Sequence, residues 1–113
     1  MTPLDTDVIE DYHAHVYYDA ASKEAAARLR AGVEARFEVT MGRWHDEPVG
    51  PHPRWSYQIA FKPALFGELV PWLALNRDGL VIFVHPNTGQ DLPDHDERAI
   101  WLGEKVALNL DAL

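Results

Sequence analysis

The chain has 113 residues, of which 47% are hydrophobic, so residues 1–113 are expected to form a single domain with one apolar core. It contains no cysteine, which excludes disulfides, thiolate zinc sites, iron–sulfur clusters and cysteine nucleophiles. The formal net charge is −8, with 18 acidic against 10 basic residues. Because a nucleic-acid-binding face has to be basic, we expect no nucleic-acid partner.

The hydropathy pattern shows no membrane or export signal. No apolar run approaches the roughly 18 residues that cross a bilayer as a helix. The first residues, MTPLDTDVIEDYHAH, are acidic and lack the apolar region of a secretory signal. We therefore expect a cytoplasmic protein with no membrane partner.

The first clear element is residues 10–18, EDYHAHVYY, which alternate and are rich in tyrosine and valine, as is typical of a strand. Side chains of a strand point alternately to two faces. His13, His15 and Tyr17 are therefore expected on one face of the sheet, and the small and aliphatic residues between them on the other.

The next elements are a helix, a strand, a loop and a strand. Residues 22–37 have apolar residues at helical spacing, with Ser22 as a candidate N-cap, which predicts a helix. Residues 38–44 are expected to form a strand. Residues 45–54, HDEPVGPHPR, contain three prolines and predict an extended loop. Residues 55–61, WSYQIAF, predict the following strand.

The second half of the chain repeats the pattern of helix and strand. A second helix is expected to begin at Pro63, which suits its first turn, and to end at the turn 76–79. Residues 80–84, LVIFV, predict a buried strand. Asp94 and Glu97 have the spacing of a capping box and predict a short helix that continues to Trp101.

The order of these elements indicates the fold. The tail 106–110, VALNL, is expected to be an edge strand or a docking segment. The order β-α-β-β-α-β with this appendage predicts an α+β, ferredoxin-like fold, in which an antiparallel sheet carries both helices on one face. The short C-terminal helix and strand appendage, or a second copy in a homodimer, is expected to cover the other face.

Three histidines are expected on one face of this sheet. In the ferredoxin-like order the first strand lies between the third and the fourth, so His85, at the end of the fourth, lies near His13. Alternation places His13, His15 and His85 on the face without helices. A single histidine on a strand is more often an ordinary hydrogen-bonded residue, but this convergence predicts a metal site.

Spacing alone leaves the other histidines open. His52 lies in Gly50-Pro51-His52-Pro53, where flanking prolines stiffen its backbone, yet its loop is expected at the far end of the first strand. His95 is a candidate outer-sphere acid or base, or simply a solvated side chain. His45 has the weakest case of the six histidines.

Further candidates surround the histidines in the sequence. A carboxylate ligand could come from Glu10, Asp11, Glu47, Asp91 or Asp94. A substrate carboxylate could be bound by Arg43, Arg54 or Arg98. An aromatic pocket could be lined by Tyr17, Trp44, Trp55 and Phe83. Fe(II), Zn(II), Cu(II), Ni(II) and Mn(II) all suit neutral imidazoles, so the residues do not select the metal.

Four short motifs occur in order along the chain. They are YHAHVYY at 12–18, PVGPHP at 48–53, VHPNTG at 84–89, and Asp94-His95 followed by Arg98 and Trp101. Together they resemble the DOPA 4,5-dioxygenase family over nearly the whole chain.

The resemblance implies a small ferredoxin-like enzyme that uses Fe(II) and O₂ for extradiol cleavage of L-DOPA or a related catechol. Carried over to this sequence, it implies His15, His52 and His85 as metal ligands. It implies His13 and His95 as catalytic residues that move protons during ring opening. A different divalent metal, such as Zn(II), could occupy the site of a purified sample.

Two other classes of function fit the same residues. One is a non-catalytic metal-binding or small-ligand-binding dimer on the same scaffold. The other is a metal-independent isomerase that uses one histidine as a base. Both keep the ferredoxin-like fold. They differ from the dioxygenase because neither combines metal binding with O₂ consumption.

Overall fold

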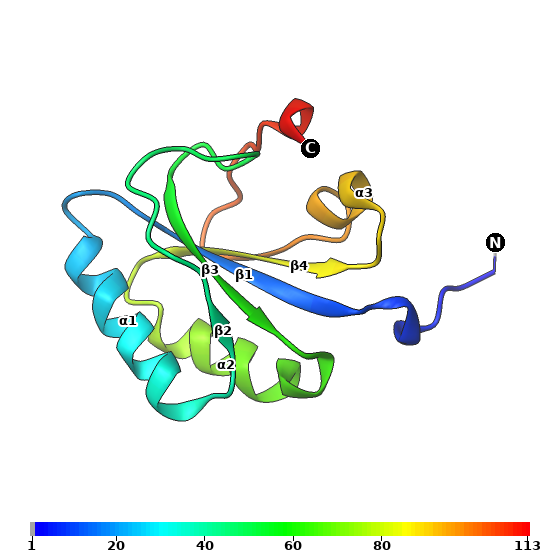
Figure 1. Cartoon of the computed structure of the whole chain (residues 1–113), viewed down its shortest axis with the longest axis horizontal. Coiled ribbons are helices and arrows are strands. Elements are labelled where there is room, and N and C mark those ends of the chain that lie inside the picture. Colours follow the sequence, from blue (N-terminus) through cyan, green and yellow to red (C-terminus); the bar gives the residue numbers. More distant parts are fainter. Residues whose placement is uncertain (1) are drawn as a thin grey trace.

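The computed structural model describes residues 2–113. Its centre is an antiparallel five-stranded sheet in the order β2-β3-β1-β4-β5, with α1 and α2 on one face and α3 on the other (Figure 1). The elements in chain order are η1 (Thr6–Val8), β1 (Asp11–Tyr18), α1 (Lys23–Arg36), β2 (Thr40–Met41), β3 (Trp55–Phe61), η2 (Pro63–Leu65), α2 (Phe66–Asn76), β4 (Val81–Asn87), α3 (Asp91–His95), β5 (Ile100–Leu102) and η3 (Leu110–Ala112). The predicted α+β, ferredoxin-like class is confirmed. None of the helices in the described residues is long and apolar enough to cross a membrane.

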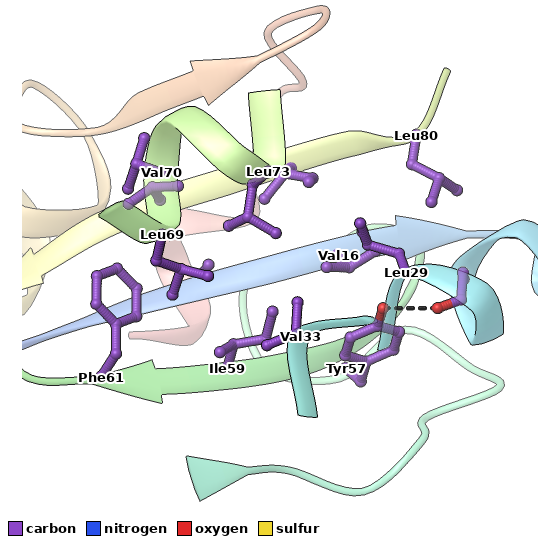
Figure 2. Packing of buried hydrophobic residues seen from close by; sticks show 14 of the residues in the cluster. Val16, Leu29, Val33, Tyr57, Ile59, Phe61, Leu69, Val70, Leu73 and Leu80 are labelled. Atoms are coloured by element: carbon purple, nitrogen blue, oxygen red, sulfur yellow. Dashed lines mark hydrogen bonds between the residues drawn. The ribbon is translucent and has the colours of Figure 1, made fainter. Parts of the chain in front are cut away.

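The apolar core lies between the sheet and the two long helices (Figure 2). On this face of the central strand, Ala14 and Val16 have no exposed surface. The helices bury Ala26, Leu29 and Val33 from α1, and Leu69, Val70 and Leu73 from α2. The Tyr57 hydroxyl donates a hydrogen bond of 2.7 Å to the Ala26 carbonyl, which ties β3 to α1. Fully burying one such aliphatic side chain stabilises the fold by about 1.5–3 kcal/mol.

The central strand β1 determines where the strand histidines lie. In the register of the sheet His13 is opposite His85, and His15 is opposite Phe83. On the other side of β1, His13 is opposite Ala60. Because residues directly opposite one another share a face, the predicted proximity of His13 and His85 is confirmed.

The face of the sheet without α1 and α2 is covered by segments of the same chain. Tyr17, Val81 and Phe83 pack there against Trp101 of β5 and against Val106 and Leu108 of the C-terminal segment. The C-terminal segment also contacts the 45–54 loop, because the Asn109 N–H donates to the Pro51 carbonyl at 2.9 Å. The appendage therefore covers part of this face, and the expected homodimer stays a prediction.

Two predicted strands differ from the structure in length, and the tail adopts one of its two predicted alternatives. The strand predicted at 38–44 is only Thr40–Met41 in β2, although pairing with β3 resumes at a single bridge between His45 and Ser56. The strand predicted at 80–84 is longer, since β4 continues through Asn87 beside β1. The tail 106–110 forms no strand and is a docking segment.

The short helix predicted from Asp94 to Trp101 is wrong. The helix α3 comes earlier and ends at His95, and Ile100–Leu102 pair with the free edge of β4 as β5. Asp94 makes no capping box, because its carboxylate accepts hydrogen bonds from Thr88 and Arg98 instead. Long-range pairing with an open strand edge therefore overrides a weak local helix signal.

Candidate metal centre

Five of the six histidines form one contiguous group, which we call the histidine cluster: His13, His15, His52, His85 and His95. The ring centroids of His15 and His85 are 5.1 Å apart, as are those of His13 and His85. The His52 ring lies 4.1 Å from His15, and the His95 ring lies 4.0 Å from His85. The sixth, His45, is bridged through its backbone to Ser56 on β3 and has no ring contact with the cluster within residues 2–113.

The 45–54 loop brings His52 into the cluster from the far end of β1. Its turn is closed by the His52 N–H, which donates to the Val49 carbonyl at 3.0 Å, and is held from outside by the bond between Asn109 and Pro51. The loop thus lies over the helix-free face, with the His52 ring against His15. The loop starts at the far end of β1, as expected, and its fold over this face still brings His52 close to the strand histidines.

Three members of the cluster have the geometry of a metal site. Ring nitrogens of His13, His15 and His85 all lie within 4.8 Å of one another. The Nε2 atoms of His15 and His85 are 3.0 Å apart. Two nitrogen ligands about 2.1 Å from one ion, at an angle near 90°, are also about 3.0 Å apart. The donor set therefore fits a divalent metal, and it contains His13 where the resemblance implied His52.

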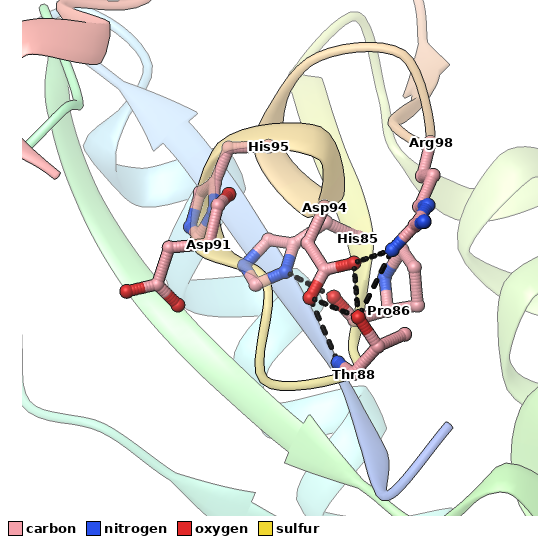
Figure 3. Close-up of polar contacts among 7 residues, drawn as sticks. All are labelled: His85, Pro86, Thr88, Asp91, Asp94, His95 and Arg98. Atoms are coloured by element: carbon pink, nitrogen blue, oxygen red, sulfur yellow. Dashed lines mark hydrogen bonds and ion pairs between the residues drawn. The ribbon is translucent and has the colours of Figure 1, made fainter. Parts of the chain in front are cut away.

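Backbone carbonyls orient two imidazoles of the histidine cluster, those of His85 and His95 (Figure 3). His85 Nδ1 lies 3.0 Å from the Pro86 carbonyl oxygen, and His95 Nδ1 lies 2.7 Å from the Asp91 carbonyl oxygen. A carbonyl only accepts, so in both residues Nδ1 carries the proton and Nε2 carries the lone pair. Such outer hydrogen bonds are the usual way in which a protein orients metal-binding histidines.

Burial keeps four histidines of the cluster, His13, His15, His52 and His85, neutral. Burial is the main cause that lowers the pKa of His52 and of His85 to about 4, and that of His15 well below its usual range. Repulsion from neighbouring imidazoles lowers these pKa values further. Burial also lowers the pKa of His13, partly opposed by the nearby Asp11 carboxylate. At neutral pH these rings are therefore uncharged, which is the form that binds metals.

A buried carboxylate holds the segment that carries His95. Asp94 is 1% exposed and accepts hydrogen bonds from the Thr88 N–H at 2.7 Å, the Thr88 hydroxyl at 2.9 Å and Arg98 at 3.0 Å (Figure 3). Burial alone raises the pKa of Asp94, but these hydrogen bonds outweigh it and the pKa is lowered. Because α3 has only five residues, it needs this clamp to hold His95 over His85.

The remaining candidates have other contacts. Arg98 pairs with Asp94 rather than facing a ligand, and Arg54 pairs with Glu104 at 2.9 Å. Arg43 is exposed. Trp44 packs on Tyr18, in the cluster on the helix-covered face. None of the candidate carboxylates belongs to the three-histidine group in the described residues; those considered were Glu10, Asp11, Glu47, Asp91 and Asp94.

Sequence reasoning missed two features of this site. The Tyr17 hydroxyl contacts His52 Nδ1 at 2.8 Å, and the Thr88 side chain belongs to the Asp94 clamp. Strand alternation placed Tyr17 on the correct face, but no local signal pairs it with a residue 35 positions away. Of the expected pocket aromatics, Phe83 stacks on His15 with ring centroids 5.6 Å apart.

Comparison with known proteins identifies the family. The sequence model of the Dopa 4,5-dioxygenase family matches residues 12–112. The chain is 37% identical to a DOPA 4,5-dioxygenase of Amanita muscaria, over 97% of this chain and 52% of that protein. It is 38% identical to an uncharacterized 21.2 kDa protein of Botryotinia fuckeliana, over 96% of this chain and 66% of that one.

A solved structure is also similar. The crystal structure of a candidate dioxygenase from Nostoc punctiforme matches with a TM-score of 0.96 and 55% identity, over 97% of this chain and 96% of that one. The chain thus has the length of this structural neighbour but spans only about half to two thirds of the two fungal proteins. The chain belongs to the Dopa 4,5-dioxygenase family.

Proposed function

We propose that this protein is a non-haem iron dioxygenase that opens the ring of L-DOPA or a related catechol with O₂, by extradiol cleavage. The observation that carries the proposal is the group of three neutral imidazoles, His13, His15 and His85, with the spacing of metal ligands. Membership of the Dopa 4,5-dioxygenase family supports the choice of reaction.

In this proposal His13, His15 and His85 hold Fe(II), so His13 takes the place in the donor set that the resemblance implied for His52. Bound iron supplies a Lewis acid that lowers the pKa of a catechol hydroxyl and brings catechol and O₂ together. Pro86 and Phe83 support the ligands, the first by accepting the His85 Nδ1 proton and the second by stacking on His15.

His95 is the candidate for proton transfer. Its Nε2 carries a lone pair, because Nδ1 donates to the Asp91 carbonyl, and its side chain is only half-buried. With a lone pair on Nε2, the imidazole accepts a proton from a catechol hydroxyl as the substrate binds and returns it as the ring opens. Since His13 is also half-buried while His15 and His85 are buried, the substrate approaches from the side of His13 and His95.

Anaerobic reconstitution tests the proposal. Protein purified without a histidine tag is loaded with Fe(II), mixed with L-DOPA and then exposed to air. We expect absorbance of a ring-opened semialdehyde and a matching uptake of O₂. L-Tyrosine, which has one ring hydroxyl, is the control substrate and should give neither signal.

The other outcomes favour the alternatives. Metal binding without turnover of any catechol would support a non-catalytic binding protein. Turnover of a substrate that survives removal of the metal by a chelator would support a metal-independent isomerase. Either result contradicts the dioxygenase.

A further inference from the structure

The proposed reaction does not use the phenol of Tyr17, which is buried beside the histidine cluster. Tyr17 follows His15 by two residues on the helix-free face of β1 and is only 2% exposed. Its ring makes edge contacts with the rings of Trp101 and His52, whose centroids are 6.2 Å and 5.6 Å away. Its hydroxyl oxygen is 2.8 Å from His52 Nδ1, the one hydrogen-bond partner that this hydroxyl has within residues 2–113.

The chemistry of the two groups determines the direction of this hydrogen bond. A neutral phenol carries one proton, and a buried O–H without an acceptor is unfavourable. His52 Nδ1 is the acceptor within reach, so the Tyr17 hydroxyl donates to it. A neutral imidazole that accepts at Nδ1 carries its own proton on Nε2. His52 therefore has the opposite tautomer from His85 and His95, whose Nδ1 atoms donate to carbonyls.

The nitrogen spacing separates His52 from the metal ligands. The group of three nitrogens within 4.8 Å of one another omits His52, although its ring lies 4.1 Å from His15. His52 Nδ1 accepts from the Tyr17 hydroxyl, which leaves the imidazole proton on Nε2. His52 thus lies beside the metal site, outside its donor set, with an N–H to donate.

We propose that Tyr17 is a positioning residue that holds His52 as the Nε2–H tautomer, so that His52 donates a hydrogen bond to an anionic oxygen of the bound catecholate. The inference rests on the proposed function for the identity of that oxyanion. A catechol bound at a metal carries negative charge on oxygen, and a fixed N–H donor in a water-poor site stabilises such charge. His52 is fixed there by its ring contact with His15 and by the loop that Asn109 holds.

Ring-nitrogen NMR tests the tautomer directly. Protein labelled with ¹⁵N in its histidines is measured without metal and at neutral pH, and the signals missing from His52→Ala identify His52. We expect the Nε2–H pattern for His52 and the Nδ1–H pattern for His85. Tyr17→Phe, which removes only the hydroxyl oxygen, should convert His52 to a mixture of both tautomers. An Nδ1–H pattern for His52 in the unmodified protein would overturn the proposal.

Metal binding provides a second readout. His52→Ala should bind Fe(II) or Zn(II) at one ion per chain. Its metal affinity should fall by no more than roughly 10–100-fold, which is the usual cost of changing an outer-sphere residue. His15→Ala is the matched control and should lose binding altogether. If His52→Ala loses the metal as His15→Ala does, His52 is a ligand and the inference is wrong.

These readouts separate the inference from the proposed function. Unmodified protein that binds no iron would contradict the dioxygenase, while the NMR result would still decide the tautomer. With L-DOPA, the kcat losses of Tyr17→Phe and His52→Ala should not multiply in the double variant, because both act through one hydrogen-bond donor. Multiplying losses would show that Tyr17 acts independently of His52.

Discussion

The two faces of the sheet use the same strands in opposite ways. The face under α1 and α2 buries aliphatic residues such as Val16 and Ile59, and its cover is two regular helices. The other face presents His13, His15 and Tyr17, and its cover is a loop, the short helix α3 and the C-terminal segment. The larger apolar cluster therefore lies on one face and the candidate metal centre on the other, separated by one layer of backbone.

This separation predicts that the two faces fail in different ways when they are altered. A change on the helix-covered face should lower the free energy of unfolding and leave metal binding by the folded protein intact. A change of a histidine in the three-nitrogen group, such as His15 or His85, should abolish metal binding and leave the fold intact.

Leu69→Ala is expected to have the largest effect on stability. Leu69 on α2 has no exposed surface, and a cavity of this kind costs about 2–5 kcal/mol in the free energy of unfolding. Urea denaturation measures it, with Leu75→Ala on the same helix as the control, because Leu75 is 86% exposed. Loss of metal by the folded Leu69→Ala protein would show that the faces are coupled.

His15→Ala and His85→Ala should each remove the metal and keep the fold. Each deletes one of the two nitrogens that lie 3.0 Å apart, so the site can no longer be completed. Metal analysis after dialysis should find none, while circular dichroism stays unchanged. Full metal content in either variant would exclude that histidine as a ligand.

Asp94→Asn should have an intermediate and local effect. The variant weakens the hydrogen bonds that Thr88 and Arg98 donate to a charged carboxylate, which costs about 1–3 kcal/mol. Because these bonds lower the pKa of Asp94 below its unfolded value, the stabilisation is present at neutral pH and is lost as the pH falls through the folded pKa.

Urea melts at decreasing pH check this sign. The difference between the unmodified protein and Asp94→Asn should be largest at neutral pH and should shrink in acid. Asp96→Asn is the control, since Asp96 is exposed. A difference that grows in acid would contradict the lowered pKa.

His45→Ala is expected to be nearly silent in activity and metal content. His45 contacts β3 through its backbone and lies outside the histidine cluster. A large loss of iron or of L-DOPA turnover in this variant would show that the boundary of the cluster is wrong.

Much of this arrangement follows from local patterns. Alternation along residues 10–18 separates His13, His15 and Tyr17 from Ala14 and Val16, because successive side chains of a strand point to opposite faces. Helical spacing likewise marks the buried residues of α1 and α2. The ferredoxin-like order then places His85 opposite His13.

The positions of His52 and His95 depend instead on contacts between residues far apart in the chain. His52 reaches His15 because Asn109 holds its loop and Tyr17 binds its ring. Neither contact can be predicted from the sequence pattern around residue 52. His95 lies over His85 because a buried Asp94 carboxylate binds Thr88 and Arg98, where the same residue suggested a helix cap. Irregular segments have no periodic pattern of their own, so their place on the sheet is determined by the sum of such long-range contacts.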